Sequence, residues 1–269
     1  MTPLTRLRIE RRGGIVLCGF DNPPHGYMDD AMVRDLDRVT AEAAEDRDLR
    51  AIVFYGRVPG VFIQHYSVEE LEDLARRLRE RGTTVDTARP VPERQIDRVF
   101  ARLETMPVVT IAAINGNAMG GGFEFCLCCD LRVGEDGPYS LGLPEVNIGI
   151  LPGAGGTQRL PRLIGAGRAL AMILAGRTIA PAEAARLGIV TELAPAGGAL
   201  GLALALAERI AAQPARAVAY CKQLVRAAME TPLAEGLARE RTLFLDLLLS
   251  DEALARMSAM NRGERDIRD

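Results

Sequence analysis

The 269-residue sequence has no tryptophan, only two histidines and no long uninterrupted apolar run. A membrane-spanning helix needs roughly 18 consecutive apolar residues, and Gly, Arg or Asp breaks every apolar stretch well before that length. The first residues, MTPLTRLRIERRGG, lack the apolar segment of a secretory signal peptide. We therefore expect a cytoplasmic protein without a membrane partner.

Neither sign of charge is in strong excess. The sequence has 33 basic and 36 acidic residues, which is a net charge of −3, and its pI is near 5.6. This balance provides no general attraction for nucleic acid or for an anionic lipid surface. No basic stripe interleaved with aromatic residues is present either. A nucleic-acid partner, and RNA binding in particular, is therefore not expected.

Cysteine is sparse and odd in number. Five cysteines argue against a disulfide framework and are typical of a protein from a reducing compartment. Cys126, Cys128 and Cys129 invite a metal hypothesis, but residues two and three apart on one helix diverge around its axis. The second ligand pair of a zinc site is also missing. We expect these cysteines to pack in a core, with no metal.

The two histidines, His25 and His65, are the only candidates for the base of a Ser-His-Asp triad. No G-x-S-x-G segment accompanies either of them, so that mechanism is disfavoured.

Two glycine-rich runs, GGG at residues 120–122 and LPGAGG at 151–156, lack both the dinucleotide fingerprint and the P-loop lysine. A glycine turn at a helix start can aim a backbone N–H at a developing oxyanion. It can equally serve only a tight turn with close packing, and spacing alone leaves both interpretations open.

Strand and helix patterns alternate along the first 197 residues. β-Branched and alternating runs predict strands, apolar residues three and four apart predict helices, and Ser67 with Glu70 is a capping box. The predicted strands span residues 7–20 as a hairpin, 49–57, 108–115, 131–136 and 189–194. The predicted helices span residues 28–46, 67–82, 156–176 and 180–190, with another around Glu124. Residues 198–269 have an almost entirely helical pattern, so we predict an α/β core over 1–197 followed by a helical region.

Two acids, Glu124 and Glu145, lie beside the glycine-rich runs and among apolar residues. Glutamate is almost never fully buried unless it is paired or used. Two carboxylates in an apolar pocket could move protons, because desolvation raises their pKa towards neutrality. They could equally be surface acids that complement helix dipoles, and the residues alone do not decide between these interpretations.

Residues 111–133, IAAINGNAMGGGFEFCLCCDLRV, and 143–165, LPEVNIGILPGAGGTQRLPRLIG, closely resemble the enoyl-CoA hydratase/isomerase family, the crotonase superfamily. The resemblance extends over most of the chain. It implies an α/β fold, the crotonase (ClpP-like) spiral of β-β-α units, with a C-terminal helical trimerisation region over residues 198–269. It also implies a homo-oligomer, either a trimer or a dimer of trimers, and an acyl-CoA thioester as substrate. Coenzyme A is then part of the substrate, and no separate cofactor is expected.

The resemblance also implies roles for individual residues. Glu124 would help to activate the water that adds to C3, and Glu145 would exchange the proton at C2. The backbone N–H groups of Tyr66 and Gly121 would form the oxyanion hole for the thioester oxygen. Contacts with substrate or coenzyme A are implied at Gln64, His65, Ser67, Gly120, Gly153, His25, Gly26 and Tyr27.

Both acids are retained, which favours hydration of a 2-enoyl-CoA, since many isomerases and hydrolases of the family lack one. The segment FIQHYSV departs from the family, which has small residues where His65 and Tyr66 stand here. An isomerase, hydrolase or decarboxylase reaction through the same oxyanion hole is therefore the alternative within the family. A non-catalytic or RNA-binding member of the family is a further alternative.

Overall fold

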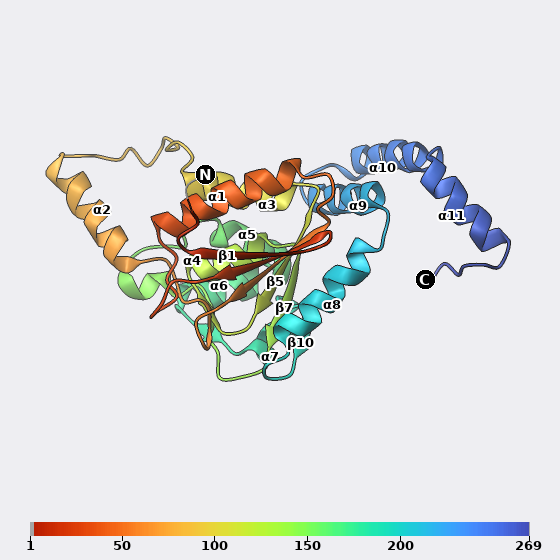
Figure 1. The fold of residues 1–269 in the computed structure, drawn as a ribbon. Helices are drawn as coiled ribbons and strands as arrows, with labels where there is room; N and C mark the ends of the chain where they lie inside the picture. Colours follow the sequence, from red (N-terminus) through yellow and green to blue (C-terminus); the bar gives the residue numbers. More distant parts are fainter. Residues whose placement is uncertain (1–2, 269) are drawn as a thin grey trace.

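The structure, a computed structural model, describes residues 3–268. Its fold repeats a β-β-α unit whose two strands enter different sheets (Figure 1). The first strands, in the larger sheet, are β3 (Ala51–Gly56), β5 (Val109–Ile114) and β7 (Leu131–Glu135). The second strands, in the smaller sheet, are β4 (Val61–Ile63), β6 (Asn117–Met119) and β8 (Leu141–Gly142). The chain thus winds as the spiral that the resemblance implies.

The larger sheet has six strands in the order β1-β2-β3-β5-β7-β10, and the smaller has four in the order β4-β6-β8-β9. The remaining strands are β1 (Leu7–Arg12), β2 (Ile15–Phe20), β9 (Thr178–Ile179) and β10 (Glu192–Ala194). Only the β1–β2 hairpin and the β8–β9 pair are antiparallel within the described residues. The predicted strands are confirmed, whereas β4, β6, β8 and β9 are too short for a periodic pattern to indicate them.

Helices follow the strands and then dominate the C-terminal part. In the core they are α1 (Asp30–Glu45), α2 (Val68–Glu80), α3 (Gln95–Thr105), α4 (Gly121–Cys128), α5 (Gly156–Ile164), α6 (Ala166–Leu174) and α7 (Pro181–Arg186). A 3-10 turn, η1 (Glu145–Ile148), follows β8. The C-terminal helices are α8 (Ala199–Ala211), α9 (Ala215–Ala227), α10 (Leu233–Leu248) and α11 (Asp251–Asn261). These confirm the predicted helices, whereas α3 was not predicted. Of the predicted capping box, Ser67 accepts the Glu70 N–H at 3.3 Å, but the Glu70 side chain accepts from the Asp30 N–H instead.

The strands β2, β3, β5 and β7 of the larger sheet are buried on both faces, as the continuous apolar runs of β2, β3 and β5 require. Along β3, Ile52 and Phe54 face the main core, which also contains the buried cysteines of α4. Ala51 and Val53 face the opposite way, against the buried alanines of α8. Because α8 covers one face of this sheet, it belongs to the packing of the core. The division of the chain at residue 198 stays a prediction.

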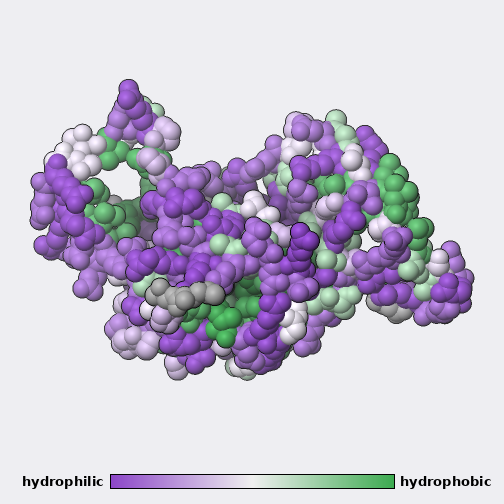
Figure 2. Space-filling view, turned by 45° about the horizontal axis from the view of Figure 1, so that its top comes forward, coloured by the Kyte–Doolittle hydropathy of each residue, from purple (hydrophilic) through white to green (hydrophobic). Residues whose placement is uncertain are grey.

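Two parts project from the packed body, α2 at one end and α10 and α11, reached through α9, at the other (Figure 1). Neither α2 nor these C-terminal helices contain a buried residue. The space-filling view shows apolar residues on the inner side of the projecting segment at the left, where the surface is hollowed (Figure 2). Among the described helices, none combines the length and the apolar character needed to cross a membrane.

Candidate active site

A cavity of about 610 Å³ lies beneath α2, at the ends of β4 and β6, where each of these strands of the smaller sheet leads into a helix. Its wall is mainly apolar, with Val33, Val68, Leu71, Ile96, Ile148 and Leu151 among the lining residues. Polar groups line it at Asp30, at His65 and Tyr66, at Arg94 and Gln95, at Gly120 to Glu124, at Glu145 and Asn147, and at Gly153. A mostly apolar cavity with a few convergent polar groups is typical of a small-molecule site.

The start of α4 presents a free backbone donor to this cavity. Gly120 has φ 50° and ψ −127°, a conformation that favours glycine, and it lets the chain turn from β6 into α4. Gly120 donates its N–H to Gly142 O at 2.9 Å, and its carbonyl accepts the Glu124 N–H at 2.9 Å. The Gly121 N–H has no acceptor among the described residues. It is a first-turn donor, where the helix dipole favours negative charge.

The second donor comes from the segment after β4. Met28 donates to His65 O at 2.8 Å and accepts from the Ser67 N–H at 2.7 Å. The N–H of Tyr66, which lies between these two residues, takes no part in the pairing with Met28. In the described part of the chain it has no acceptor. A Cβ on Gly121 would lie 3.7 Å from the Tyr66 nitrogen, which places the two backbones side by side. The two predicted oxyanion donors are therefore neighbours.

The bulky side chains of this segment are engaged elsewhere. The Tyr66 hydroxyl donates to Asp30 Oδ1 at 2.6 Å. Burial and then this hydrogen bond raise the pKa of Tyr66. His65 Nδ1 lies 2.8 Å from Tyr66 O, and its ring stacks on Tyr27 with a centroid distance of 4.6 Å. Tyr27 stacks in turn on His25 at 5.0 Å. Neither the His65 nor the Tyr66 side chain therefore accepts a hydrogen bond from the Tyr66 backbone N–H.

Glu124 lies in the first turn of α4, is 2 % exposed and is firmly held. Its Oε1 accepts the N–H groups of Ala154 and Gly156, each at 2.8 Å. Burial raises the pKa of Glu124, while the Gly156 and Ala154 hydrogen bonds and the positive charges of Arg159 and Arg94 act in the opposite direction. Its carboxylate is thus fixed in one orientation.

Glu145, the first residue of η1, has the opposite environment. Both of its carboxylate oxygens are buried, and neither has a hydrogen-bond partner in the part of the chain that is described. A Cβ added to Gly120 would lie 3.3 Å from Glu145 Oε1, so this carboxylate faces the turn that precedes the Gly121 donor. Burial raises the pKa of Glu145 to about 7, against the effect of its own backbone N–H and with a smaller contribution from the charge of Glu124. It can therefore hold or release a proton near neutral pH.

The other predicted residues divide into two groups. The cavity wall includes His65, Gly120 and Gly153, and the Gly153 N–H has no acceptor among the described residues. Outside the wall, the Gln64 backbone pairs with Gly26 O and Met119 N, and Ser67 caps α2. The stacked His25 and Tyr27, with Gly26 between them, reach the cavity only through His65. Contacts of this second group with a ligand remain predictions.

The residues that support Glu124 are not indicated by any pattern in the sequence. The LPGAGG run points to Gly153, but no local pattern indicates that Ala154 and Gly156 donate to a glutamate 30 and 32 positions earlier. Arg94 lies in a segment without a regular period, yet its guanidinium pairs with Asp97 and donates to Gly153 O. Only the fold brings these groups to the cavity.

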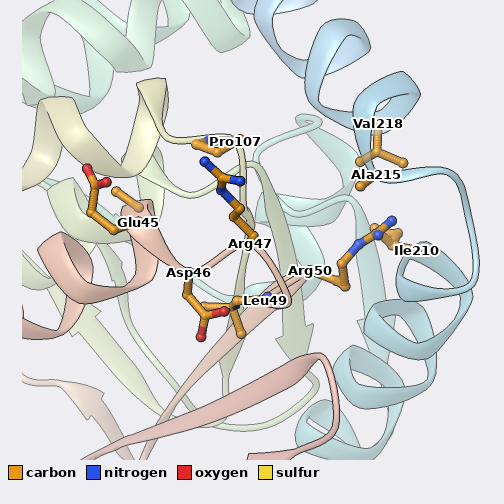
Figure 3. A pocket seen from close by; sticks show the side chains of 10 residues that line it. Glu45, Asp46, Arg47, Leu49, Arg50, Pro107, Ile210, Ala215 and Val218 are labelled. Atoms are coloured by element: carbon orange, nitrogen blue, oxygen red, sulfur yellow. Dashed lines mark hydrogen bonds between the residues drawn. The ribbon is translucent and has the colours of Figure 1, made fainter. Parts of the chain in front are cut away.

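A second hollow, of about 130 Å³, lies between the C-terminal end of α1, the start of β3 and the helices α8 and α9 (Figure 3). Asp30, at the start of α1, lines the first cavity, whereas Glu45, at its end, lines this one. A helix of this length spans about 24 Å, so the hollow is remote from the two glutamates. Arg50, which points across it, donates to Gln213 O. In the described residues, no cluster of His, Cys, Asp and Glu could hold a metal ion.

Comparisons with known proteins agree on one family. The model of the family described as Enoyl-CoA hydratase/isomerase matches residues 10–262. The 2,3-dehydroadipyl-CoA hydratase of Escherichia coli is 32% identical over 258 residues, which cover 95% of this chain and 95% of that protein. Mouse enoyl-CoA hydratase domain-containing protein 2 is 34% identical over 86% of this chain and 76% of its own length. The crystal structure of an enoyl-CoA hydratase from Bacillus anthracis superposes with a TM-score of 0.85 at 28% identity, covering 96% of this chain and 97% of that one.

Proposed function

Because the chain belongs to the enoyl-CoA hydratase/isomerase family, we propose that it adds water syn across the double bond of a 2-enoyl-CoA thioester. The observation that carries this proposal is the pair of unlike carboxylates in one apolar cavity. Glu124 is held by two N–H groups, whereas Glu145 is buried without a partner. Two carboxylates whose surroundings differ in this way can take the base role and the acid role of one reaction.

The oxyanion donors stabilise the charge that the reaction creates. When water adds at C3, the π electrons move towards the thioester oxygen and give it enolate character. The free N–H groups of Tyr66 and Gly121 are adjacent and supported by strand and helix backbone, so they need no reorganisation to bind this oxygen. Removing one such donor from an oxyanion hole typically costs about 3 kcal/mol of transition-state stabilisation.

The two carboxylates then account for the protons. Glu124, with Oε1 fixed by the backbone, orients the water and takes one proton as the C3–O bond forms. The Gly153 N–H, which is free and lines the cavity, is a further donor for this water. Glu145, whose pKa is raised to about 7, delivers a proton to C2. The product carries the hydroxyl at C3 and the new hydrogen at C2, and solvent exchange restores the two acids.

The experiment that tests the proposal follows the ultraviolet absorbance of the conjugated thioester of crotonyl-CoA. Purified protein is expected to cause a fall that the Glu145→Gln variant does not cause. Calorimetric titration with a CoA thioester shows whether that variant still binds. If the unmodified protein binds the thioester and leaves its absorbance unchanged, hydration of this substrate is excluded.

The alternative within the family is another acyl-CoA reaction through the same enolate, namely isomerisation, hydrolysis or decarboxylation. A panel of thioesters separates these reactions, because a hydratase leaves saturated thioesters intact and releases neither free CoA nor carbon dioxide. The Tyr66 hydroxyl, which donates to Asp30, favours hydration, since it is engaged and does not add a catalytic group.

Self-association belongs to the same proposal. The C-terminal helices expose large apolar side chains, including Leu233, Phe244, Leu245, Leu249 and Leu254. Surfaces of this kind mark interaction sites in proteins of this size. We expect a trimer or a dimer of trimers, and light scattering during gel filtration measures this directly. A monomer at micromolar concentration would contradict it.

A further inference from the structure

Arg159, in α5, connects three segments around the Glu124 carboxylate. Its Nε and Nη2 donate to the two oxygens of Glu104, on α3, at 2.8 and 2.7 Å. Its Nη1 donates to Ala154 O at 2.9 Å. Because the guanidinium makes a bidentate pair and a backbone bond together, its plane has one orientation.

The backbone that Arg159 holds is the backbone that holds Glu124. Ala154 accepts from Arg159 through its carbonyl and donates to Glu124 through its N–H, and Gly156 donates to the same carboxylate oxygen. The guanidinium lies over Gly155, where a Cβ would come within 1.9 Å of Nη1 and where φ is +103°. A displaced Arg159 would therefore release the turn that orients Glu124.

The same ion pair extends to the C-terminal region through α9. Arg226 Nη1 lies 3.5 Å from Glu104 Oε1, so Glu104 is shared between α5 and α9. Arg226 Nη2 also donates to Asp130 Oδ1 at 2.9 Å and to Cys128 O at 2.9 Å, at the end of α4. The helix α9 thus contacts both the support of the turn and the C-terminal end of the helix that carries Glu124.

We propose that Arg159 is a positioning residue, which aligns Glu124 for catalysis through the Ala154 backbone, and that Arg226 makes this alignment depend on the docking of α9. The inference rests on the proposed function, because alignment of Glu124 matters only if that carboxylate orients the reacting water. It assigns a role in the chemistry to a C-terminal helix that lines no part of the cavity. A misplacement of about 1 Å in such a group can lower the rate about 100-fold.

The pH–rate profile provides a second readout, because the charge of Arg159 acts on the pKa of Glu124. The charged and titratable groups that face Glu124 are Arg159 from α5, Arg94 from the start of α3, Glu145 from η1 and Cys128 on α4. The positive charge of Arg159 lowers the pKa of Glu124 against the effect of burial. Removing that charge raises this pKa, so more of the enzyme has a protonated base at a given acidic pH. The acidic limb of the pH–rate profile then moves to higher pH.

The test compares Arg159→Met, Arg159→Lys and the matched control Arg162→Met. Arg162 lies on the same helix, but it only approaches Glu230 at 3.9 Å and donates to Gln158 O. We expect Arg159→Met to lower kcat about 100-fold with KM within about twofold, and to move the acidic limb upward. The control leaves both readouts unchanged. Circular dichroism and Tm verify that each variant is folded.

Arg159→Lys separates geometry from charge and serves if Arg159→Met does not fold. Lysine keeps the charge but cannot make the bidentate pair, so kcat falls about tenfold while the acidic limb stays in place. An active enzyme whose Arg159→Met and Arg159→Lys variants keep normal kcat and an unmoved limb would overturn the positioning role. An unmodified protein that hydrates no 2-enoyl thioester would overturn the proposed function, and this inference with it.

The contribution of α9 is tested by a double-mutant cycle on kcat. If Arg226 acts through Glu104 and Arg159, Arg226→Met lowers kcat on its own but has no further effect in the Arg159→Met background. Independent, multiplicative effects of the two substitutions on kcat would contradict the claim that α9 acts on Glu124 through Arg159.

Discussion

The two glutamates of the cavity have the same side chain and opposite surroundings. At the start of α4, Glu124 accepts two backbone N–H groups and is almost fully buried. In η1, Glu145 has two buried oxygens and, among the described residues, no partner for either. Burial raises the pKa of both, but only Glu124 has donors from another segment, Ala154 and Gly156, that stabilise its charge, whereas only the backbone N–H of Glu145 itself lowers the pKa of Glu145. A carboxylate whose charge is less stabilised favours its neutral form, and this difference is why the proposed reaction uses Glu124 as the base and Glu145 as the acid.

Rigidity of the carboxylate distinguishes Glu124, whereas a raised proton affinity distinguishes Glu145. A base that orients water needs a lone pair in a fixed direction, and the turn at residues 153–156 fixes the carboxylate of Glu124. An acid must be protonated near the working pH, and the apolar surroundings of Glu145 achieve this by raising its pKa. Each region of the cavity therefore supplies what the other lacks.

The largest expected effects come from removing each carboxylate in turn. Glu124→Gln and Glu145→Gln are each expected to lower kcat for crotonyl-CoA by about 1,000-fold, because general acid–base catalysis contributes about 100- to 10,000-fold. Ultraviolet absorbance assays measure kcat, and matched titrations with the thioester measure its binding to each variant. The fold persists in both, since a glutamine oxygen can still accept from Ala154 and Gly156 and a neutral amide suits the site of Glu145. Near-normal turnover by both variants would exclude the two-acid mechanism.

A second prediction concerns a substitution at Gly120, in the turn that lies between the two glutamates. Gly120→Ala forces a β-carbon into a backbone conformation with φ 50° and within 3.3 Å of Glu145 Oε1. We expect kcat to fall about 100-fold from displacement of the Gly121 donor, with a loss of about 1–3 kcal/mol in the free energy of unfolding. The control is Gly167→Ala in α6, where nothing lies within 4 Å of the added carbon. That substitution is expected to leave kcat unchanged, and equal losses in the two variants would refute the argument.

The pH dependence gives a third, smaller effect that distinguishes the two acids. Hydration needs protonated Glu145, whose pKa is about 7, so kcat/KM falls about tenfold per pH unit above that pKa. Dehydration of the 3-hydroxyacyl product needs the deprotonated form, so its rate falls below the same pKa. The two carboxylates interact, and the apparent values belong to the pair. Profiles in both directions test this, and an alkaline limb that survives Glu145→Gln would contradict the assignment.

The smallest effect is expected at the side chain of Tyr66. Tyr66→Phe removes the hydroxyl that bonds Asp30 and leaves the backbone N–H in place. We expect kcat within about twofold of the unmodified enzyme and a loss of about 1 kcal/mol in the free energy of unfolding. Thermal denaturation and the crotonyl-CoA assay measure the two quantities. A loss of activity comparable to that of Glu145→Gln would place the hydroxyl in the chemistry instead.

Much of the fold could be predicted because its patterns are local. The β1–β2 hairpin, α1 and the capped start of α2 each depend on contiguous residues, and the structure has them within a few residues of the predicted bounds. The short strands β4, β6, β8 and β9 escaped prediction because two or three residues carry no period. They nevertheless form the smaller sheet that positions the site.

Two motifs of consecutive residues were enough to identify the family, and the resemblance they carry names Glu124, Glu145 and the two donor segments as candidates. The different surroundings of the two glutamates follow from tertiary contacts. The donors to Glu124 come from 30 and 32 positions away, Arg159 meets Glu104 across 55 positions, and Glu145 is left without a partner. Such contacts depend on how the spiral packs its turns together, and no local pattern encodes which polar group finds a partner there.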